Sequence, residues 1–387
     1  MEKRHIAILG STGSIGRQAL DVIGQHRDLF EVELLTANNS TDLLIQQAIE
    51  FDVNAVVICN EDRYQEVKDA LDPHDIKVFA GMQSVCDLVT GDNIDIVLTS
   101  MVGFSGLSST VAAVNAGKTI ALANKESLVV AGEMIMPMAL ERKVPILPID
   151  SEHSAIFQCL AGEMHNKVEK IILTASGGPF FGKTRDELKK VTARDALRHP
   201  NWDMGAKITI DSASMFNKAL EIVEARWLFD AKPEQIEVLI HPQSIVHSMI
   251  QFKDGAVLAQ LGAPDMRVPI AYAMSYPERI ITDAPKADFA AIGSCTFSAA
   301  DTVRFPAIRI AYETLRAGGA AACMMNAANE EANAHFRAGN MKFTDIARVV
   351  ENTLQRAGDL PADSIEQVYF ADELARRIAR EEMAKLS

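Results

Sequence analysis

The sequence lacks two features that mark common classes of protein. It has no apolar run of the about 20 residues that a transmembrane helix needs, so we expect no membrane-spanning segment. It also has no excess of basic residues: 38 Lys and Arg stand against 52 Asp and Glu, which gives a net charge of −14. Because phosphate backbones and anionic membrane surfaces attract clustered Lys and Arg, neither nucleic acid nor a membrane is an expected partner. A small phosphorylated substrate is compatible with this charge, since it needs only a local basic group.

Cysteine is also scarce. The 387 residues contain 5 cysteines, scattered and without a CxxC pair, which argues against a zinc site and against a disulfide scaffold. A reducing compartment is therefore expected. The opening stretch, MEKRHIAILGSTG, passes directly into a predicted strand without a signal peptide, so the cytoplasm is the expected location.

The first 150 residues alternate between two patterns. Short β-rich runs, separated mostly by helical patterns, lie at 5–9, 32–37, 54–59, 76–80, 94–100, 119–124 and 144–150. This alternation predicts a parallel, doubly wound α/β sheet of the Rossmann type, with a nucleotide at the carboxyl ends of the strands. The chain is too long for one ordinary core, so about two or three domains are expected.

A glycine-rich turn follows the first predicted strand. Gly10, Gly13 and Gly16 separate that strand from a helical pattern, which is the context that a dinucleotide-binding turn requires. The spacing is GxxGxxG rather than GxGxxG, and an ordinary tight turn fits the glycines equally well. The second strand ends in Thr36-Ala37-Asn38-Asn39, without an Asp or Glu for a free ribose 2′-hydroxyl. This favours NADP, although no Arg or Lys is present there for the 2′-phosphate.

Polar side chains follow two later strands. Asn124-Lys125-Glu126-Ser127 comes after one, and Asp150-Ser151-Glu152-His153 comes after the next. In an extended backbone Asp150 and Glu152 would face the same side, where two carboxylates need a cation or proton between them. Oxygen-only ligation suits Mg²⁺ or Mn²⁺. The alternatives are an acidic helix start for the carboxylates and an exposed helix-start residue for Lys125.

Beyond residue 150 the pattern becomes α+β and then helical. A strand at 167–178 ends in the turn Ser176-Gly177-Gly178-Pro179, and a charged helix is predicted over 183–197. The next strands, over 236–262, are predicted to be antiparallel around an Asp-Gly turn. We expect a nucleotide-binding domain over 1–150, an α+β catalytic domain over 151–276, a linker over 277–305 and a small helical bundle over 306–387.

The segment from 199 to 229 combines a loop with a helix. Residues 199–207 fit neither period and resemble a mobile loop over a site. A helix is predicted from about Ala213, with Ser212 at its start as a cap or anion ligand. Asn217, Lys218 and Glu221 would then share one face of that helix. The alternative is an ordinary amphipathic helix with solvated charges.

Several blocks of sequence together resemble one enzyme family over nearly the whole chain. They are GSTGSIG, ALANKESLV, PIDSEHSAIFQ, SGGPF, HPNWDMGAKITIDSA followed by MFNKALEIVEARWLF, HPQSIVHSMI and LGAPDMR. The chain thereby resembles the 1-deoxy-D-xylulose 5-phosphate reductoisomerases. The resemblance implies conversion of 1-deoxy-D-xylulose 5-phosphate to 2-C-methyl-D-erythritol 4-phosphate, with NADPH and a divalent cation, by a homodimer. The segment after the second strand departs from many members, which carry a basic or Gly-Lys-Asn-like segment where this chain has Ala37-Asn38-Asn39-Ser40.

The resemblance also implies roles for individual residues. The metal ligands would be Asp150, Glu152 and Glu221, and the catalytic residues Lys125, Glu152 and His199. The substrate would also contact Ser151, and its phosphate would be held by Ser176, His199, Ser212, Asn217 and Lys218. The loop with His199, Trp202 and Met204 would close over the substrate. The NADPH site would be lined by Thr12, Gly13, Ser14, Ile15, Asn39, Asn124, Glu126 and Gly205.

Two other functions fit parts of the sequence. A semialdehyde or acyl-phosphate dehydrogenase would share the glycine turn, but it needs an activated cysteine at a strand-to-helix turn. Cys59 ends an apolar strand, and Cys159 and Cys323 lie in apolar helical runs. An NADP-sensing regulator would combine the nucleotide-binding domain with a helical interaction module, and it would not need Asp150, Glu152 and Glu221 to converge on one point.

Overall fold

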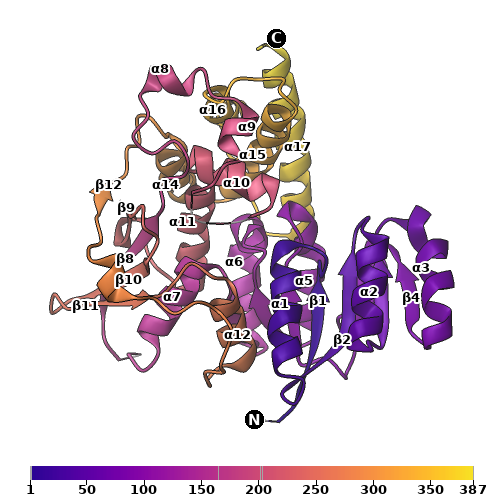
Figure 1. The fold of residues 1–387 in the computed structure, drawn as a ribbon. Coiled ribbons are helices and arrows are strands. Elements are labelled where there is room, and N and C mark those ends of the chain that lie inside the picture. Colours follow the sequence, from indigo (N-terminus) through magenta and orange to yellow (C-terminus); the bar gives the residue numbers. More distant parts are fainter. Residues whose placement is uncertain (1, 164, 201, 203, 387) are drawn as a thin grey trace. The chain divides into compact units, whose positions relative to one another are not determined.

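The structure of the protein is a computed structural model that describes residues 2–163, 165–200, 202 and 204–386. The chain divides into two compact units (Figure 1). The first unit comprises Met1–Ser127, Ile135–Ser154 and Asp265–Ala284. The second comprises Leu128–Met134, Ala155–Pro264 and Pro285–Ser387.

The first unit is built on a parallel sheet. Its strands are β1 (Arg4–Leu9), β2 (Phe30–Ala37), β3 (Ala55–Ile58), β4 (Lys77–Ala80), β5 (Ile96–Thr99), β6 (Thr119–Leu122) and β7 (Ile146–Pro148). They lie in the order β4-β3-β2-β1-β5-β6-β7, and every neighbouring pair is parallel. The central strands are fully buried, as in β1, whose residues from Ile6 to Leu9 are 0% exposed. The predicted doubly wound α/β sheet is confirmed.

The crossover helices of this sheet follow from the sequence, but one helix comes from far along the chain. The connecting helices are α1 (Ser14–Gln25), α2 (Thr41–Phe51), α3 (Tyr64–Leu71), α4 (Gly81–Leu88), α5 (Leu107–Asn115) and α6 (Glu126–Glu141). The distant helix is α12 (Arg267–Ser275), which packs against α1. Its Arg267 forms ion pairs with Asp21 at 3.1 Å and Asp265 at 2.7 Å. The first unit therefore gains a helix from beyond residue 260.

The second unit contains a mixed sheet. Its strands are β8 (Val168–Ala175), β9 (Ile236–Ile240), β10 (Val246–Phe252), β11 (Val257–Leu261) and β12 (Ser298–Ala299), in the order β11-β10-β8-β9-β12. The β10–β11 hairpin is antiparallel, as predicted. β9 also runs opposite to β10, but the two are not neighbours: β9 pairs in parallel with β8, and β10 pairs antiparallel with β8. Because β8 lies between β9 and β10, the chain crosses over the end of β8 through residues 241–245. His241 holds that connection, since its Nε2 accepts hydrogen bonds from the N–H groups of Ile245 and Val246 at 3.1 Å each.

Helices make up most of the second unit. The main ones are α7 (Ser151–Leu160, which begins in the first unit), α10 (Ala206–Ser214), α11 (Phe216–Leu228), α14 (Ala307–Ala317), α15 (Ala321–Arg337), α16 (Asp345–Ala357) and α17 (Ile365–Ala384). The predicted helices after residue 306 are confirmed. The predicted linker over 277–305 passes from the first unit to the second after residue 284, and it contains α13 (Phe289–Ile292) and β12.

The predicted charged helix over 183–197 is wrong. Two short helices, α8 (Arg185–Leu188) and α9 (Ala193–Ala196), take its place. Each starts with a capping box, in which the hydroxyl of Thr184 or Thr192 accepts the N–H three residues later. The cap at Thr192 gives that residue an extended backbone conformation, and a continuous helix is thereby interrupted.

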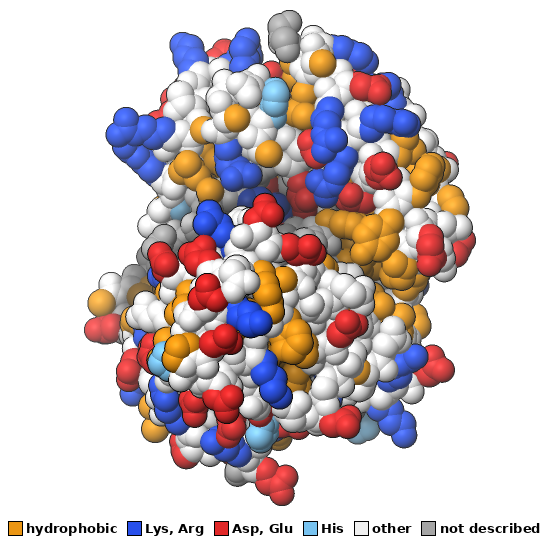
Figure 2. Space-filling model, turned by 90° about the vertical axis from the view of Figure 1, so that its right-hand side faces the viewer, with side chains coloured by type: hydrophobic (Ala, Val, Ile, Leu, Met, Phe, Trp, Pro, Cys, Tyr) orange, Lys and Arg blue, Asp and Glu red, His pale blue; other side chains and the backbone are white. Residues whose placement is uncertain are grey.

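The surface carries charges of both signs. On the face drawn in Figure 2, Lys and Arg side chains are interspersed with Asp and Glu over the residues shown in colour. Among the described residues, no helix has the length and apolar character needed to cross a membrane.

Candidate active site

The glycine turn after β1 is tightly packed against its own first unit. Gly10 has a φ of +87°, and its N–H donates to Thr36 Oγ1 of β2 at 2.9 Å. A Cβ on Gly16 would lie 2.5 Å from the carbonyl oxygen of Gly10, so only glycine allows the start of α1 to touch the turn. Gly13 occupies the N-cap of α1 and has no side chain with which to cap it. The first N–H groups of α1 therefore depend on water or on an anionic ligand.

Replacing Gly16 by alanine is expected to destabilise the first unit by about 1–3 kcal/mol, because the added methyl group meets backbone atoms that cannot move aside. Chemical unfolding followed by circular dichroism measures this. Gly24→Ala is the matched control, since its Cβ would meet only Phe51 at 3.9 Å and alanine is the better helix former. Equal stabilities of the two variants would contradict the tight packing.

The predicted polar residues of the first unit follow strands that run in the same direction. Asn39 follows β2, Lys125 follows β6, and Asp150 follows β7, while the glycine turn follows β1. Because these strands are parallel, all four positions lie at the carboxyl edge of one sheet. The structure thus brings the predicted NADPH residues 12–15, Asn39, Asn124 and Glu126 to one edge.

Asn124 stabilises this edge of the sheet through buried hydrogen bonds. Its side chain is buried, and its Nδ2 donates to the carbonyl oxygens of Met101 at 2.6 Å and Gly103 at 3.0 Å. Its Oδ1 accepts a hydrogen bond from the hydroxyl of Ser127. Glu126, also buried, begins α6 and accepts from Asn124 at 3.0 Å. The amide of Asn124 therefore holds the segment after β5 in place.

Lys125 and Asp150 form an ion pair in the first unit. Both side chains are largely buried, at 5% and 13% exposed. The predicted extended backbone from Asp150 to Glu152 is wrong, because α7 begins at Ser151 and Ser154 N–H donates to Asp150 O at 2.8 Å. Asp150 therefore precedes the helix and Glu152 lies in its first turn. The hydroxyl of Ser151 donates to Glu152 at 2.5 Å.

On α11 of the second unit the three predicted polar residues form one hydrogen-bonded group, in which Lys218 and Glu221 are buried and Asn217 is half-buried. Glu221 is 0% exposed and Lys218 is 3% exposed. The ammonium of Lys218 and the amide of Asn217 both donate to the Glu221 carboxylate, the amide at 2.5 Å. The alternative of a helix with solvated charges is therefore wrong here. Glu224, one turn later, is equally buried, and the sequence analysis did not single it out.

The predicted start of this helix at about Ala213 is wrong. Residues 206–214 form α10, Met215 adopts a left-handed conformation with a φ of 66°, and α11 begins at Phe216. Ser212 therefore lies in the last turn of α10 rather than at a helix start. Ser214 donates its hydroxyl to Ile210 O at 2.9 Å. An anion near Ser212 could therefore be bound by the Ser212 hydroxyl group. It would not meet the free N–H groups of the first turn of α10, because these lie at the opposite end of the helix.

Three of the residues predicted to hold phosphate lie near one another in the second unit. Ser176 Oγ is 3.2 Å from His199 Nε2. Gly178, two residues after Ser176, lies directly against the end of α10, since a Cβ there would be 2.8 Å from Ser212 O.

In the predicted loop over 199–207, residues 201 and 203 lie outside the described residues, and Gly205 is the N-cap residue of α10. The backbone N–H of Trp202 donates to His199 Nδ1 at 3.0 Å.

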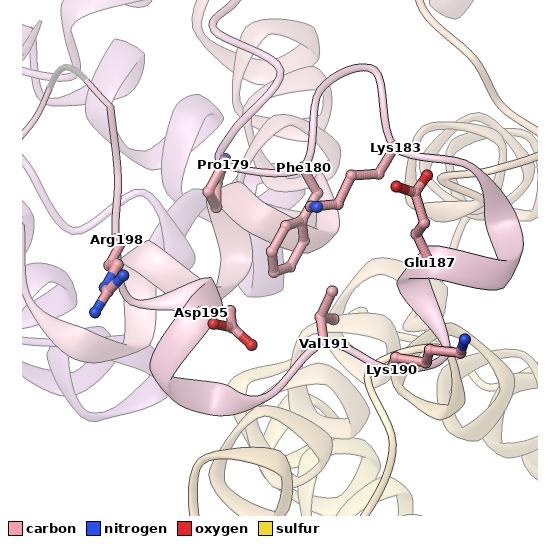
Figure 3. A pocket seen from close by; sticks show the side chains of 8 residues that line it. All are labelled: Pro179, Phe180, Lys183, Glu187, Lys190, Val191, Asp195 and Arg198. Carbon is pink, nitrogen blue, oxygen red and sulfur yellow. The ribbon is translucent and has the colours of Figure 1, made fainter.

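The segment between the Ser176 turn and His199 encloses a cavity of about 480 Å³ (Figure 3). It is lined by Pro179, Phe180, Lys183, Glu187, Lys190, Val191, Asp195 and Arg198. None of these is a predicted site residue. Its two carboxylates serve the capping boxes of α8 and α9, so they are part of the local structure.

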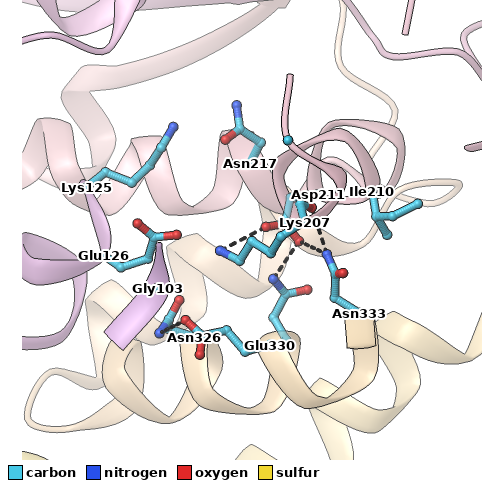
Figure 4. Close-up of polar contacts among 12 residues, drawn as sticks. Gly103, Lys125, Glu126, Lys207, Ile210, Asp211, Asn217, Asn326, Glu330 and Asn333 are labelled. Carbon is cyan, nitrogen blue, oxygen red and sulfur yellow. Dashed lines mark hydrogen bonds and ion pairs between the residues drawn. The ribbon is translucent and has the colours of Figure 1, made fainter. Parts of the chain in front are cut away.

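The sequence analysis missed a buried carboxylate on α10. Asp211 is 1% exposed and accepts hydrogen bonds from Asn329 and Asn333 of α15, at 2.8 Å each. Lys207 lies 3.0 Å from its second oxygen (Figure 4). The sequence carried a signal: Asn326, Asn329 and Asn333 recur at helical spacing on the buried face of α15, where amides need partners.

None of the three cysteines whose pKa is shifted is an activated nucleophile. Burial raises the pKa of the Cys159 thiol to about 11, and burial also raises the pKa values of Cys59 and Cys323. A nucleophilic cysteine needs a lowered pKa. These three residues therefore argue against the acyl-enzyme chemistry of a semialdehyde dehydrogenase.

Comparison with protein families gives consistent matches along the chain. The profile of the 1-deoxy-D-xylulose 5-phosphate reductoisomerase family matches residues 6–132. The profile of the C-terminal domain of that family matches residues 146–229. A further profile, the DXP reductoisomerase C-terminal domain, matches residues 261–378.

Individual relatives match over their full length. The reductoisomerase of Bacteroides fragilis is 54% identical over 385 residues, which cover 100% of this chain and 99% of the relative. That of Porphyromonas gingivalis is 52% identical over 383 residues, 99% of each chain. The solved reductoisomerase of Zymomonas mobilis in complex with NADPH has a TM-score of 0.93 and 41% identity, over 100% of both chains. A solved reductoisomerase with NADPH, fosmidomycin and magnesium has a TM-score of 0.94 and 38% identity, over 99% of both. The chain therefore belongs to the 1-deoxy-D-xylulose 5-phosphate reductoisomerase family, as its motifs predicted.

Proposed function

We propose that the chain converts 1-deoxy-D-xylulose 5-phosphate to 2-C-methyl-D-erythritol 4-phosphate, using NADPH and Mg²⁺ or Mn²⁺. The observation that carries this proposal is the full-length similarity to reductoisomerases, one of which was solved with NADPH, fosmidomycin and magnesium. The reaction rearranges the carbon skeleton of the substrate by retro-aldol and aldol steps, and hydride transfer then reduces the resulting aldehyde.

All but one of the proposed nucleotide-binding residues belong to the first unit, and Gly205 belongs to the second. The proposed domains remain 1–150 for NADPH binding, 151–276 for catalysis, 277–305 as the linker and 306–387 as the helical bundle, except that residues 265–284 belong to the first compact unit. The glycine turn and the uncapped start of α1 support binding of a pyrophosphate there. The nucleotide site is lined by Thr12, Gly13, Ser14, Ile15, Asn39, Asn124, Glu126 and Gly205. Asn124 acts mainly by shaping the segment that the nicotinamide contacts, because its amide is used internally.

A divalent cation is held by Asp150, Glu152 and Glu221. The donor set fits Mg²⁺ or Mn²⁺ because all three ligands are hard carboxylate oxygens. Asp150 lies beside the ammonium group of Lys125 and Glu221 beside that of Lys218. Each of these carboxylates is therefore compensated by a positive charge, as an ionised metal ligand requires. When bound, the cation polarises the substrate carbonyl as a Lewis acid.

The remaining residues bind and orient the substrate. Ser176, Ser212, Asn217 and Lys218 hold the phosphate, with His199 reaching it from the loop over 199–207. Lys125, with Glu152, moves a proton to and from the substrate oxygens, and Ser151 contacts the same group. Trp202 and Met204 cover the reactive aldehyde and exclude water. The proximity of Ser176 to His199 and of Gly178 to Ser212 supports this grouping.

The proposed function is tested by following NADPH oxidation with 1-deoxy-D-xylulose 5-phosphate under three conditions: with Mg²⁺, with Mn²⁺ and with excess chelator. We expect turnover with either metal, loss of turnover with chelator, and recovery when metal is restored. Absence of turnover with folded protein under every metal condition would overturn the proposal.

The proposed enzyme is a cytoplasmic homodimer. The edge strand β11 supports this assembly: its Val257, Leu258 and Leu261 are 48%, 41% and 41% exposed. An edge strand that exposes apolar side chains on both faces is suited to pairing with a second copy.

Leu258→Lys is therefore expected to shift the protein from dimer to monomer, because a buried ammonium would oppose association. Sedimentation velocity measures the change. Leu140→Lys is the matched control, because Leu140 is 81% exposed and lies on α6 rather than on β11. A dimer that survives the β11 substitution as well as the control would place the interface elsewhere.

A further inference from the structure

The buried carboxylate of Asp211 joins two helices of the second unit. One of its oxygens accepts hydrogen bonds from the amides of Asn329 and Asn333 at 2.8 Å each. The other lies 3.0 Å from the ammonium of Lys207, one turn earlier on α10. Asn333 also donates to the backbone oxygen of Lys207 at 2.9 Å. One carboxylate thus fixes the position of α10 along α15 (Figure 4).

The end of α10 that Asp211 holds in place is also the end that carries Ser212 of the proposed phosphate site. Ser212, the residue after Asp211, presents its carbonyl group to Gly178 of the turn that carries Ser176. Three residues further on, the left-handed Met215 ends α10 and starts α11, on which Lys218 and Glu221 lie. Any shift of α10 along α15 would therefore move Ser212 relative to Ser176 and to Lys218.

We propose that Asp211 is a positioning residue for substrate binding: through its hydrogen bonds to Asn329 and Asn333 it sets the place of Ser212 in the phosphate site. The inference rests on the proposed function, since the phosphate is that of the proposed substrate. Asp211 itself touches no reacting atom in this scheme and acts through the helix on which it lies.

A carboxylate suits this position because its three partners among the described residues are all donors. Two amide N–H₂ groups and an ammonium point at its oxygens, and a carboxylate can accept from all three. An asparagine offers one acceptor oxygen and turns an N–H₂ group towards at least one donor. Two donors that face each other in a buried site push the helices apart.

The test is steady-state kinetics of Asp211→Asn. We expect KM for 1-deoxy-D-xylulose 5-phosphate to rise by about tenfold or more, with kcat and KM for NADPH changed by less than about twofold. Asn329→Ala removes one donor and keeps the carboxylate, so its KM should rise less, by about threefold. The double variant Asp211→Asn, Asn329→Asp reverses donor and acceptor in this pair and should recover most of the substrate affinity.

Glu382→Gln is the matched control for a merely structural role. Glu382 is a buried carboxylate of the same unit that accepts from Asn352 at 3.0 Å and from Arg356 at 2.7 Å, and it joins α16 to α17. These groups and Lys385 lower its pKa to about 2, with the hydrogen bond from Lys385 the largest cause. We expect this variant to lose stability and to keep the KM of the wild type.

The inference fails if Asp211→Asn and Asn329→Ala lower stability as Glu382→Gln does while all three keep the wild-type KM. It also fails if the double variant does not recover substrate affinity relative to Asp211→Asn. If Asp211→Asn does not fold, the KM of Asn329→Ala relative to the control decides the question. A wild-type protein without turnover would overturn the proposed function instead, so the two failures are distinct.

Discussion

Glu221→Gln is expected to lower metal-dependent turnover by about three orders of magnitude. The substitution keeps the shape of the side chain but removes the only fully buried carboxylate of the proposed ligand set. Lewis-acid polarisation of a carbonyl contributes several kcal/mol to the barrier, and each about 1.4 kcal/mol corresponds to a factor of ten in rate. Turnover measured across a range of Mg²⁺ and Mn²⁺ concentrations should show both a lower rate and a weaker apparent metal affinity.

The control for this prediction is Asp230→Asn. Asp230 lies two residues beyond the end of α11 and its side chain is 96% exposed, so its loss should leave turnover unchanged within about twofold. NADPH binding, measured by fluorescence, should be retained in both variants because neither residue is among the proposed nucleotide-binding residues. An NADP-sensing regulator would be indifferent to Glu221. Equal metal affinity of Glu221→Gln and the wild type would therefore favour the sensor and count against the metal assignment.

The fold of the first unit could be predicted because each of its signals is local. A buried parallel strand reads as a continuous apolar run, and the runs at 5–9 and 32–37 became β1 and β2 within two residues at each end. Gly16 could likewise be read from its spacing, because the close contact it allows is with a turn only six residues away. The strands and the glycine turn of the first unit could therefore be predicted from contacts between residues that are close in sequence.

Errors arose where distant segments decide local structure. The sequence gives no local reason for Met215 to adopt a left-handed conformation, yet that residue separates α10 from α11 and moved the helix start from about Ala213 to Phe216. The order of the strands could not be predicted for the same reason, since β8, about 60 residues earlier in the chain, lies between β9 and β10. Pairing partners of a strand are not encoded in its own periodicity.

The candidate site could be predicted only in part. The spacing from Lys218 to Glu221 predicted that an ammonium and a carboxylate share one helix face, and the structure shows them paired. That this pair is buried rather than solvated could not be read from α11 alone, because burial depends on what covers the helix. Asp211 was missed because its partners, Asn329 and Asn333, lie more than a hundred residues away.

Lys218→Met is expected to raise KM for 1-deoxy-D-xylulose 5-phosphate by about 10- to 100-fold, since a hydrogen bond to a charged group contributes about 1.5–3 kcal/mol. The same substitution should destabilise the protein in the presence of chelator. It leaves Glu221, which is 0% exposed, without its ammonium partner, and breaking a buried ion pair in this way costs about 3–5 kcal/mol.

Added Mg²⁺ distinguishes the two roles of Lys218. If Glu221 is a metal ligand, the bound cation supplies the missing positive charge and thermal stability should recover in part, whereas the raised KM should persist because the phosphate has lost its ammonium. Lys170→Met is the matched control: Lys170 pairs with Glu237 at 2.9 Å, but both side chains are 43% exposed, so its loss should cost less than about 1 kcal/mol with or without metal. A Lys218→Met protein whose melting temperature does not respond to Mg²⁺, while the wild type binds the ion, would separate Glu221 from the metal. Lys218 would then serve only to neutralise a structural carboxylate.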